Sequence, residues 1–353
     1  MWVEQCVGKS LLCVVCIVLS FVVCDGKPAE GEIRINSGSS YAETCRLMLQ
    51  DNESSKILFD AEERSFYVNE PLQVRLVRKR HLLVRFFSPR PVNNVVIWGR
   101  WKGMPEQVKL AEFEVLPAFA EYLLPVPCIR KDAYFLTRSG RRVFVPEKRQ
   151  VEDLETEIEC ADPYFRKITS TKCHWRISFG AYQGKNWTPL LPAHAREAVA
   201  IALNLAYLFS TEEFKRELFA AEGRLYADNC RTQVDVEKLY ERIFELPALV
   251  YGHVTGVNGL GGGSVFGLAE WCYLEHYADD NCVTRTVFHE FAHCLGYNHA
   301  GNMTYENGLG KGWVALCSGL YTRMSIDEEL PVYSRRFLST RGCPYLYNVS
   351  ASL

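Results

Sequence analysis

The sequence predicts an α+β protein in two parts, an all-β, sandwich-like domain over residues 27–160 followed by a mixed domain over residues 165–353. Two observations lead to this division. Short strand-like runs separated by turns fill the first part, whereas apolar residues recur at helical spacing in the second. The length of 353 residues fits about two domains, and the charged stretch 147–159 is the expected linker.

The composition is that of an ordinary globular protein. Hydrophobic residues make up 48% of the chain and charged residues 23%, which excludes a disordered or polytopic membrane protein. The 40 Lys and Arg residues nearly balance the 42 Asp and Glu residues. The resulting net charge of −2 gives no reason to expect a nucleic-acid partner.

The N-terminus has the pattern of a signal peptide, which we predict over residues 1–24. Lys9 precedes an apolar run over residues 11–23, the length of a signal-peptide core and short of the ~20 residues that span a bilayer. We therefore expect a secreted, extracellular protein with no stable membrane insertion after the leader is removed. An uncleaved leader that anchors the chain is the alternative.

The cysteine count agrees with export. Four of the 14 cysteines lie in the leader, and the even number that remains suits a disulfide-containing secreted protein. Cys294, inside a predicted helix, is the candidate for a free buried thiol. Sequons that permit glycosylation begin at Asn52, Asn186, Asn302 and Asn348.

Six strand-like runs, separated by turns, predict the sandwich in the first part. Their ranges are 56–59, 65–68, 72–77, 82–87, 95–98 and 113–116. This part contains no ligand or catalytic motif, so a removable propeptide, an inhibitory lid and a retained accessory domain are all open. We favour the accessory domain, because strand-rich segments of this length fold on their own. Cleavage in the basic loop Arg138–Arg142 would argue for the propeptide.

In the second part, three predicted helices precede two predicted strands. The helices cover residues 193–209, 211–223 and 236–246, and the strands cover 249–254 and 264–274. The glycine run 259–263 lacks the Gly-Lys-Ser/Thr of a phosphate-binding loop, so we interpret it as a flexible turn. The stretch 263–271 has the character of an edge strand to which a peptide substrate can add.

One segment carries the chemistry, the run from His289 to His299. His289 and His293 are four residues apart, so on a helix both imidazoles project from one face and can share a metal ion. The apolar residues Val287, Phe291 and Leu295 form the buried stripe of the same helix.

The end of this helix allows a third ligand. Gly296 supplies the left-handed residue that ends the helix, and the chain can then turn to bring in His299. Three neutral imidazoles leave one coordination position open, which is how a catalytic zinc site is built. Glu290 is placed to accept a proton from the activated water without being a ligand, so we predict it as the general base.

The residues His289, Glu290, His293, Gly296 and His299 match H-E-x-x-H-x-x-G-x-x-H, and the segment thus resembles the metzincin clan of zinc metallopeptidases. The resemblance implies a metzincin-like α+β catalytic domain with a twisted sheet and an active-site helix. It covers at most about residues 165–353, and its specific part spans eleven positions. Because Ala300 follows the last histidine, the Glu of astacins and the Asp of reprolysins are both missing, and no subfamily is assigned.

The resemblance also implies a Met-turn beneath the metal. Met303 and Met324 are the two candidates, and Met303 is favoured because it closely follows His299 within a Met-x-Tyr sequence like that of the astacin turn. By the same resemblance Tyr305 is a candidate for a catalytic residue that stabilises the oxyanion. Of the other histidines, only His276 is placed to line the cleft; a structural role is the more ordinary interpretation.

These patterns together predict a secreted zinc endopeptidase that acts on a protein or peptide substrate. It would use one catalytic Zn²⁺ held by His289, His293 and His299, with Glu290 and Tyr305 as catalytic residues. The alternative is a catalytically silent zinc-binding surface or interaction protein. The intact Glu290 favours the enzyme, because the ligands alone would suffice to hold a metal.

Overall fold

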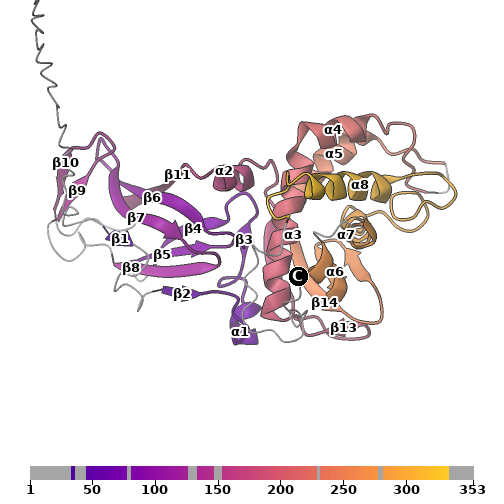
Figure 1. Cartoon of the computed structure of the whole chain (residues 1–353), viewed down its shortest axis with the longest axis horizontal. Helices are drawn as coiled ribbons and strands as arrows, with labels where there is room; N and C mark the ends of the chain where they lie inside the picture. The colour runs from indigo at the N-terminus through magenta and orange to yellow at the C-terminus, as the bar shows by residue number, and fades with distance from the viewer. Residues whose placement is uncertain are drawn as a thin grey trace, which may run out of the picture.

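The computed structural model describes residues 33–35, 45–77, 81–125, 133–146, 153–228, 231–276 and 281–333. Figure 1 shows a strand-rich N-terminal region beside a helix-rich C-terminal region, with helix α3 (Pro192–Ser210) between them. The predicted signal peptide over residues 1–24 and the sequon at Asn348 lie outside the described residues. Among the described residues, no helix is long and apolar enough to cross a membrane.

Two four-stranded sheets form the N-terminal region. One has the order β1 (Ile33–Ile35), β7 (Val108–Leu116), β6 (Val92–Trp101) and β11 (Leu154–Cys160). The other has the order β2 (Cys45–Leu47), β8 (Ala120–Pro125), β5 (His81–Phe86) and β4 (Leu72–Val77). Phe113 of β7 and Tyr122 of β8 meet between the sheets with ring centroids 5.1 Å apart, so the two layers share one apolar core.

Two local predictions in this region are wrong. Residues 56–59 were expected as a strand but belong to a short helix, α1 (Ser55–Leu58), in which Leu58 alone is buried. The second half of the expected linker 147–159 is not a linker, because Glu155–Glu159 lie within β11 and pair with β6. The charged side chains of β11 alternate outward from the edge of the sheet, which explains why the strand was mistaken for a connecting segment.

The basic loop of the N-terminal region joins the two strands of a hairpin, β9 (Ala133–Leu136) and β10 (Arg142–Val145). Arg138 at its tip forms ion pairs with Glu157 and Glu159 of β11. A cut before Val143 would therefore fall within a folded hairpin that is attached to the sandwich, rather than in a free connecting loop.

A six-stranded sheet forms the centre of the C-terminal region. Three parallel strands lie at its middle: β12 (Arg176–Phe179), β14 (Ala248–Val254) and β16 (Val265–Ala269). At one edge, β15 (Gly259–Gly262) pairs antiparallel with β16, and β13 (Trp187–Thr188) adds to β14. The other edge is β3 (Phe66–Tyr67), which comes from the N-terminal region.

The glycine-rich segment differs from its prediction. The run 259–263 was interpreted as a turn, but residues 259–262 are the edge strand β15 itself. The predicted strand 264–274 ends at Ala269, where the chain enters helix α6 (Glu270–Glu275). Glycine weakens a strand when considered alone, and here pairing along the whole length of β15 with β16 overrides that preference.

Helices cover the sheet and set the position of the metal-site motif. They are α2 (Pro163–Thr169), α4 (Glu212–Phe219), α5 (Val236–Glu245), α7 (Asn281–Cys294) and α8 (Trp313–Ile326), in addition to α3 and α6. Phe291 of α7 packs against Trp175, Phe209 and Phe266, with ring centroids 5.4, 4.8 and 6.4 Å apart. These buried rings fix the helix on the sheet next to β15.

The described cysteines do not form disulfides. Cys45, Cys160, Cys173, Cys272, Cys294 and Cys317 are all free thiols. The disulfide prediction is therefore wrong for these six, while the prediction that Cys294 is a free buried thiol is confirmed. An even cysteine count does not reveal that four of these thiols are buried in the core. Cys128, Cys230, Cys282 and Cys343 lie outside the residues whose side chains the structure describes.

Candidate metal centre

Helix α7 presents the predicted ligands as the sequence spacing requires. Val287, Phe291 and Leu295 are buried, as predicted, and turn the opposite face of the helix towards a cleft. Gly296 has φ +81° and ends the helical segment, where its N–H bonds to the carbonyl of His293. The chain then reverses and brings His299 back towards the helix.

The three histidines converge through one kind of nitrogen. The Nε2–Nε2 distances are 3.1 Å between His289 and His293, 3.0 Å between His293 and His299, and 3.2 Å between His289 and His299. Among the described residues, this is the group of His, Cys, Asp and Glu side chains whose geometry can hold a metal ion. The predicted ligand set is thus brought together in space.

Backbone carbonyls orient two of these rings. His289 Nδ1 lies 3.0 Å from the carbonyl oxygen of Thr304, and His293 Nδ1 lies 2.7 Å from that of Tyr297. Because a carbonyl only accepts, each Nδ1 carries the proton and each Nε2 exposes its lone pair. Two lone pairs 3.1 Å apart repel each other unless a cation lies between them.

The donor set fits zinc. With Zn–N bonds of about 2.0–2.1 Å, tetrahedral coordination places nitrogen ligands roughly 3.3 Å apart, close to the spacing of the three Nε2 atoms. Burial lowers the pKa of His289 to about 4 and also lowers the pKa of His293, in each case against the opposing effect of the backbone carbonyl. Both rings are therefore neutral near pH 7, which is the protonation state that ligates a metal.

Glu290 lies beside the ligands, and its side chain contacts strand β15. It is only 4% exposed, and burial raises the pKa of its carboxyl group to about 7, although a hydrogen bond from the Gly261 N–H opposes the shift. A Cβ atom at Gly259 would lie 2.4 Å from Glu290 Cγ, and one at Gly261 would lie 2.5 Å from the Glu290 carbonyl oxygen. The glycines of β15 therefore leave the space that this glutamate occupies.

The segment after His299 completes one wall of the site. Tyr305 is exposed, with its ring centroid 4.6 Å from that of His289 and 5.0 Å from that of His299. Met303 is fully buried next to Thr304, whose carbonyl orients His289. Met324 is instead a core residue within α8. These positions favour Met303 over Met324 as the residue of a Met-turn.

A cleft of about 830 Å³ opens over the histidines. Its walls are residues 256–261, the exposed face of α7, and Thr304, Tyr305 and Val314. All of these residues belong to the C-terminal region, so the described part of the N-terminal region does not cover the site. Arg285, one helical turn before His289, also lines the cleft. This residue was not predicted from the sequence, although its spacing of four residues from His289 on α7 indicates the same helix face.

Other histidines lie away from the ligands. His276 is buried, not in the cleft, and its ring contacts Glu197 at 3.0 Å and the Tyr321 hydroxyl at 3.2 Å. His194 and His253 are neighbours with ring centroids 4.0 Å apart, a pairing that their distance of 59 positions in the sequence did not suggest.

One sequon is part of the site's support. Asn302 is 1% exposed; its side chain accepts a hydrogen bond from the Tyr226 N–H at 2.7 Å and donates one to the Arg224 carbonyl at 2.8 Å. Both polar atoms of the amide are thus used within the fold. We therefore expect Asn302 to be unglycosylated in the folded protein.

Comparisons of the chain with protein-family models, with curated proteins and with solved structures give no match.

Proposed function

We propose that the protein is a secreted zinc-dependent endopeptidase, and that its C-terminal region is a metzincin-like catalytic domain. The observation that carries the proposal is the convergence of three imidazole Nε2 atoms at 3.0–3.2 Å in an open cleft, beside a buried carboxylate that is not a ligand. A structural zinc site is closed by four protein ligands, whereas three ligands at a cleft leave a position for water and substrate.

His289, His293 and His299 would hold the metal through Nε2, with the Thr304 and Tyr297 carbonyls fixing two of the rings. When bound, zinc supplies a Lewis acid that polarises the substrate carbonyl and acidifies water. Glu290 would take the proton of the attacking water and pass it to the leaving amine. Burial raises the pKa of Glu290 to about 7 in the metal-free site, and the charge of a bound cation would lower it again, so the carboxylate would be free to accept the proton near neutral pH.

Two further parts of the cleft support peptide hydrolysis. The edge strand β15 runs along the cleft beside Glu290, so an extended peptide can add to it by main-chain hydrogen bonds. The exposed hydroxyl-bearing ring of Tyr305 stands over His289 and His299, where a phenol can donate to the carbonyl oxygen as it becomes an oxyanion.

Metal analysis combined with proteolysis tests the proposal. The purified protein should contain about one zinc per chain, and a strong chelator should abolish hydrolysis of a mixed protein substrate. Glu290→Ala should keep the zinc and lose hydrolysis, whereas Glu275→Ala, at an exposed position on α6 outside the cleft, should change neither. Bound zinc with no hydrolysis by the wild type would instead support a silent zinc-binding protein.

A further inference from the structure

A second hollow lies next to the cleft at one end of β15. It has a volume of about 500 Å³ and shares residues 256–258 with the wall of the main cleft. Its other walls come from the end of β14, from Thr188 and from the start of α6. A substrate would reach this hollow by extending past the first residue of β15 and around residues 256–258.

The direction of β15 indicates which part of a substrate would reach it. The strand runs from Gly259 to Gly262, and antiparallel pairing is the slightly more stable arrangement for an added peptide. Such a peptide has its C-terminal half beside Gly259 and the loop before it. Leu260 lies between the two glycines that contact Glu290, and Val257 is three residues away, or about 10 Å along an extended chain.

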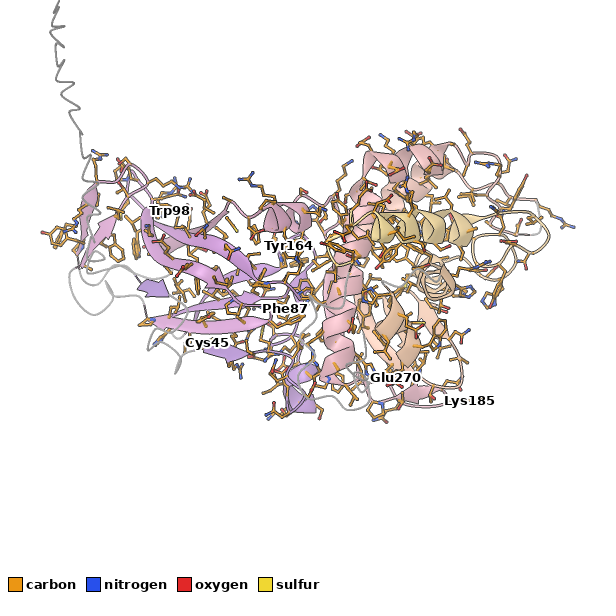
Figure 2. The ribbon with its side chains drawn as sticks, viewed as in Figure 1. Cys45, Phe87, Trp98, Tyr164, Lys185 and Glu270 are labelled. Carbon is orange, nitrogen blue, oxygen red and sulfur yellow. The ribbon has the colours of Figure 1, made fainter. Side chains whose placement is uncertain are left out.

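The side chains of the hollow are suited to a cation. Glu270 is exposed at its rim, and it forms no ion pair with any other residue that the structure describes. Figure 2 labels Glu270 and Lys185 at the same end of the C-terminal region, and no ion pair joins these two side chains. Trp271, the next residue, also lines the hollow and is partly buried.

His253, which also lines the hollow, adds no opposing charge. His253 Nδ1 lies 3.1 Å from the Pro189 carbonyl oxygen, and burial lowers the pKa of this histidine, so its ring is neutral near pH 7. A carboxylate and an aromatic face together attract an ammonium or guanidinium group through an ion pair and a cation–π contact. The hollow therefore offers a Lys or Arg side chain two favourable contacts and an acidic side chain a repulsion.

We propose that this hollow is a specificity subsite for a Lys or Arg side chain, located three to four residues C-terminal to the scissile bond of the substrate. The proposal rests on the proposed function, since it deepens the substrate class of the same cleft. Glu270 and Trp271 are its recognition residues.

Peptide binding to the zinc-loaded Glu290→Ala variant tests the subsite without depending on catalysis. Four fluorescent peptides with a common scissile sequence would carry Lys, Arg, Gln or Glu at the third and fourth positions after the scissile bond. We expect Lys and Arg peptides to bind three- to tenfold more tightly than the Gln peptide, and the Glu peptide to bind most weakly. Adding Glu270→Gln should remove this order, and adding Glu270→Lys should reverse it. Glu275→Gln, on the same helix but outside the hollow, is the control and should preserve it.

The outcomes separate the subsite from the enzyme hypothesis. Equal affinity for all four peptides, or a preference for Lys that survives Glu270→Gln, overturns the subsite while leaving the proposed peptidase intact. In a matched peptide set that carries the same four residues on the N-terminal side of the scissile bond, a Glu270-dependent preference for Lys or Arg overturns the assigned position. If wild-type protein loaded with zinc hydrolyses no protein substrate, the proposed function fails, whatever the binding order is.

Discussion

The two edges of the six-stranded sheet differ, because one is formed by a strand of the N-terminal region and the other borders an open cleft. At one edge, β3 from the N-terminal region pairs with β12, so that Phe66 lies opposite Ile177. At the other edge, the glycine-rich β15 borders the open cleft over the histidines. An unpaired strand edge invites pairing with another chain, so a protein must either cover it or use it. This chain covers one edge with its own N-terminal region, and the other borders the cleft in which we propose that a substrate binds.

Charged groups reinforce the covered edge. Arg176 of β12 donates to the Ser65 hydroxyl and to the Ala61 carbonyl, both at 3.1 Å. Arg196 of α3 is buried and donates to the Leu49 carbonyl and to Asp51. The comparison of the two edges thus assigns the N-terminal region a structural role in the six-stranded sheet, and none of its described residues lines the cleft.

The largest expected effect concerns removal of the covered edge. If the N-terminal region were a propeptide, the active secreted form would begin near Val143 and would lack β3. Because β3 pairs with β12 and the buried Arg196 bonds across the junction, we expect the active form to keep residues 45–142. N-terminal sequencing of active protein checks this. A start near Val143, with full activity, would contradict the structural role of the covered edge.

A single substitution tests the same edge with a smaller expected loss of stability. Arg64 is fully buried next to Phe66, and its guanidinium bonds to both oxygens of Glu53, with Nε at 3.0 Å from each. Arg64→Met leaves Glu53 buried without its partner, which typically costs about 3–5 kcal/mol. Urea denaturation should show this loss in one transition that includes zinc release, because the two regions share a sheet.

The matched control is Arg75→Met on β4. Its side chain is 43% exposed and its guanidinium lies no closer than 4.0 Å to Glu62, so we expect a loss of less than about 1 kcal/mol. Two separate unfolding transitions in the wild type would show that the covered edge does not couple the regions.

The convergence of the three histidines beside the open edge was predictable from sequence, whereas the pairing at the covered edge was not. Helical periodicity over one or two turns predicts the shared face of His289 and His293 and the apolar stripe that begins at Val287. Gly296 marks the end of that helix. Such signals are local. The pairing of Phe66 with Ile177 joins residues 111 positions apart, and no local pattern in a two-residue strand records its partner.

The glycines of the open edge show a second limit. In the sequence alone, residues 259–262 have poor strand propensity, and their role becomes apparent only when α7 places Glu290 against them. The helix at 270–275 was missed for a related reason, because Cys272 and Tyr273 read equally well as buried strand residues.

Tyr305→Phe is the next largest test, now at the open edge. The ring stands over His289 and His299, so loss of its hydroxyl should leave folding and zinc content unchanged. If the phenol stabilises the oxyanion, kcat should fall about 10²- to 10³-fold, or about 2.7–4 kcal/mol, with little change in KM. Wild-type kcat in this variant would remove Tyr305 from the catalytic residues and weaken the assignment of Met303 to the Met-turn.

Gly261→Ala tests whether the open edge positions the general base. The added Cβ would lie 2.5 Å from the Glu290 carbonyl oxygen and 2.9 Å from its Oε2, so the glutamate must shift. Overpacking of this kind typically costs about 1–3 kcal/mol of stability. Because a 1 Å misplacement of a catalytic group can cost about 10²-fold in rate, we expect a loss of up to about 10²-fold in kcat. Zinc content should be unchanged. Gly319→Ala on α8, where an added Cβ meets nothing within 4 Å, should retain full activity.

The smallest expected effect is a pH dependence of stability that arises at helix α3. This helix lies between the two edges of the sheet and contacts β12 and β14. His194 in its first turn accepts a hydrogen bond at Nδ1 from the Leu191 N–H, and protonation of that nitrogen would break the bond. Burial lowers the pKa of His194 to about 3, and the neighbouring His253 and Arg196 add to the shift. The folded protein therefore binds this proton less readily than the unfolded chain does.

The sign of the pH dependence follows from this difference. The pKa of the folded state lies below the unfolded value of about 6.5, so stability is full above pH 6.5 and is lost as the pH falls from there towards 3. Between pH 7.5 and pH 6 the contribution of His194 is a loss on the order of 1 kcal/mol. Urea midpoints at the two pH values should show this difference in the wild type and less of it in His194→Gln, which retains a side-chain acceptor for the Leu191 N–H.

His253→Gln serves as the comparison, because burial lowers the pKa of His253 as well but its ring bonds to Pro189 rather than to the start of α3. An identical pH dependence in wild type and His194→Gln would mean that the buried ring is protonated as readily in the folded protein as in the unfolded chain. It would also mean that the first turn of α3 can open without disturbing either edge of the sheet.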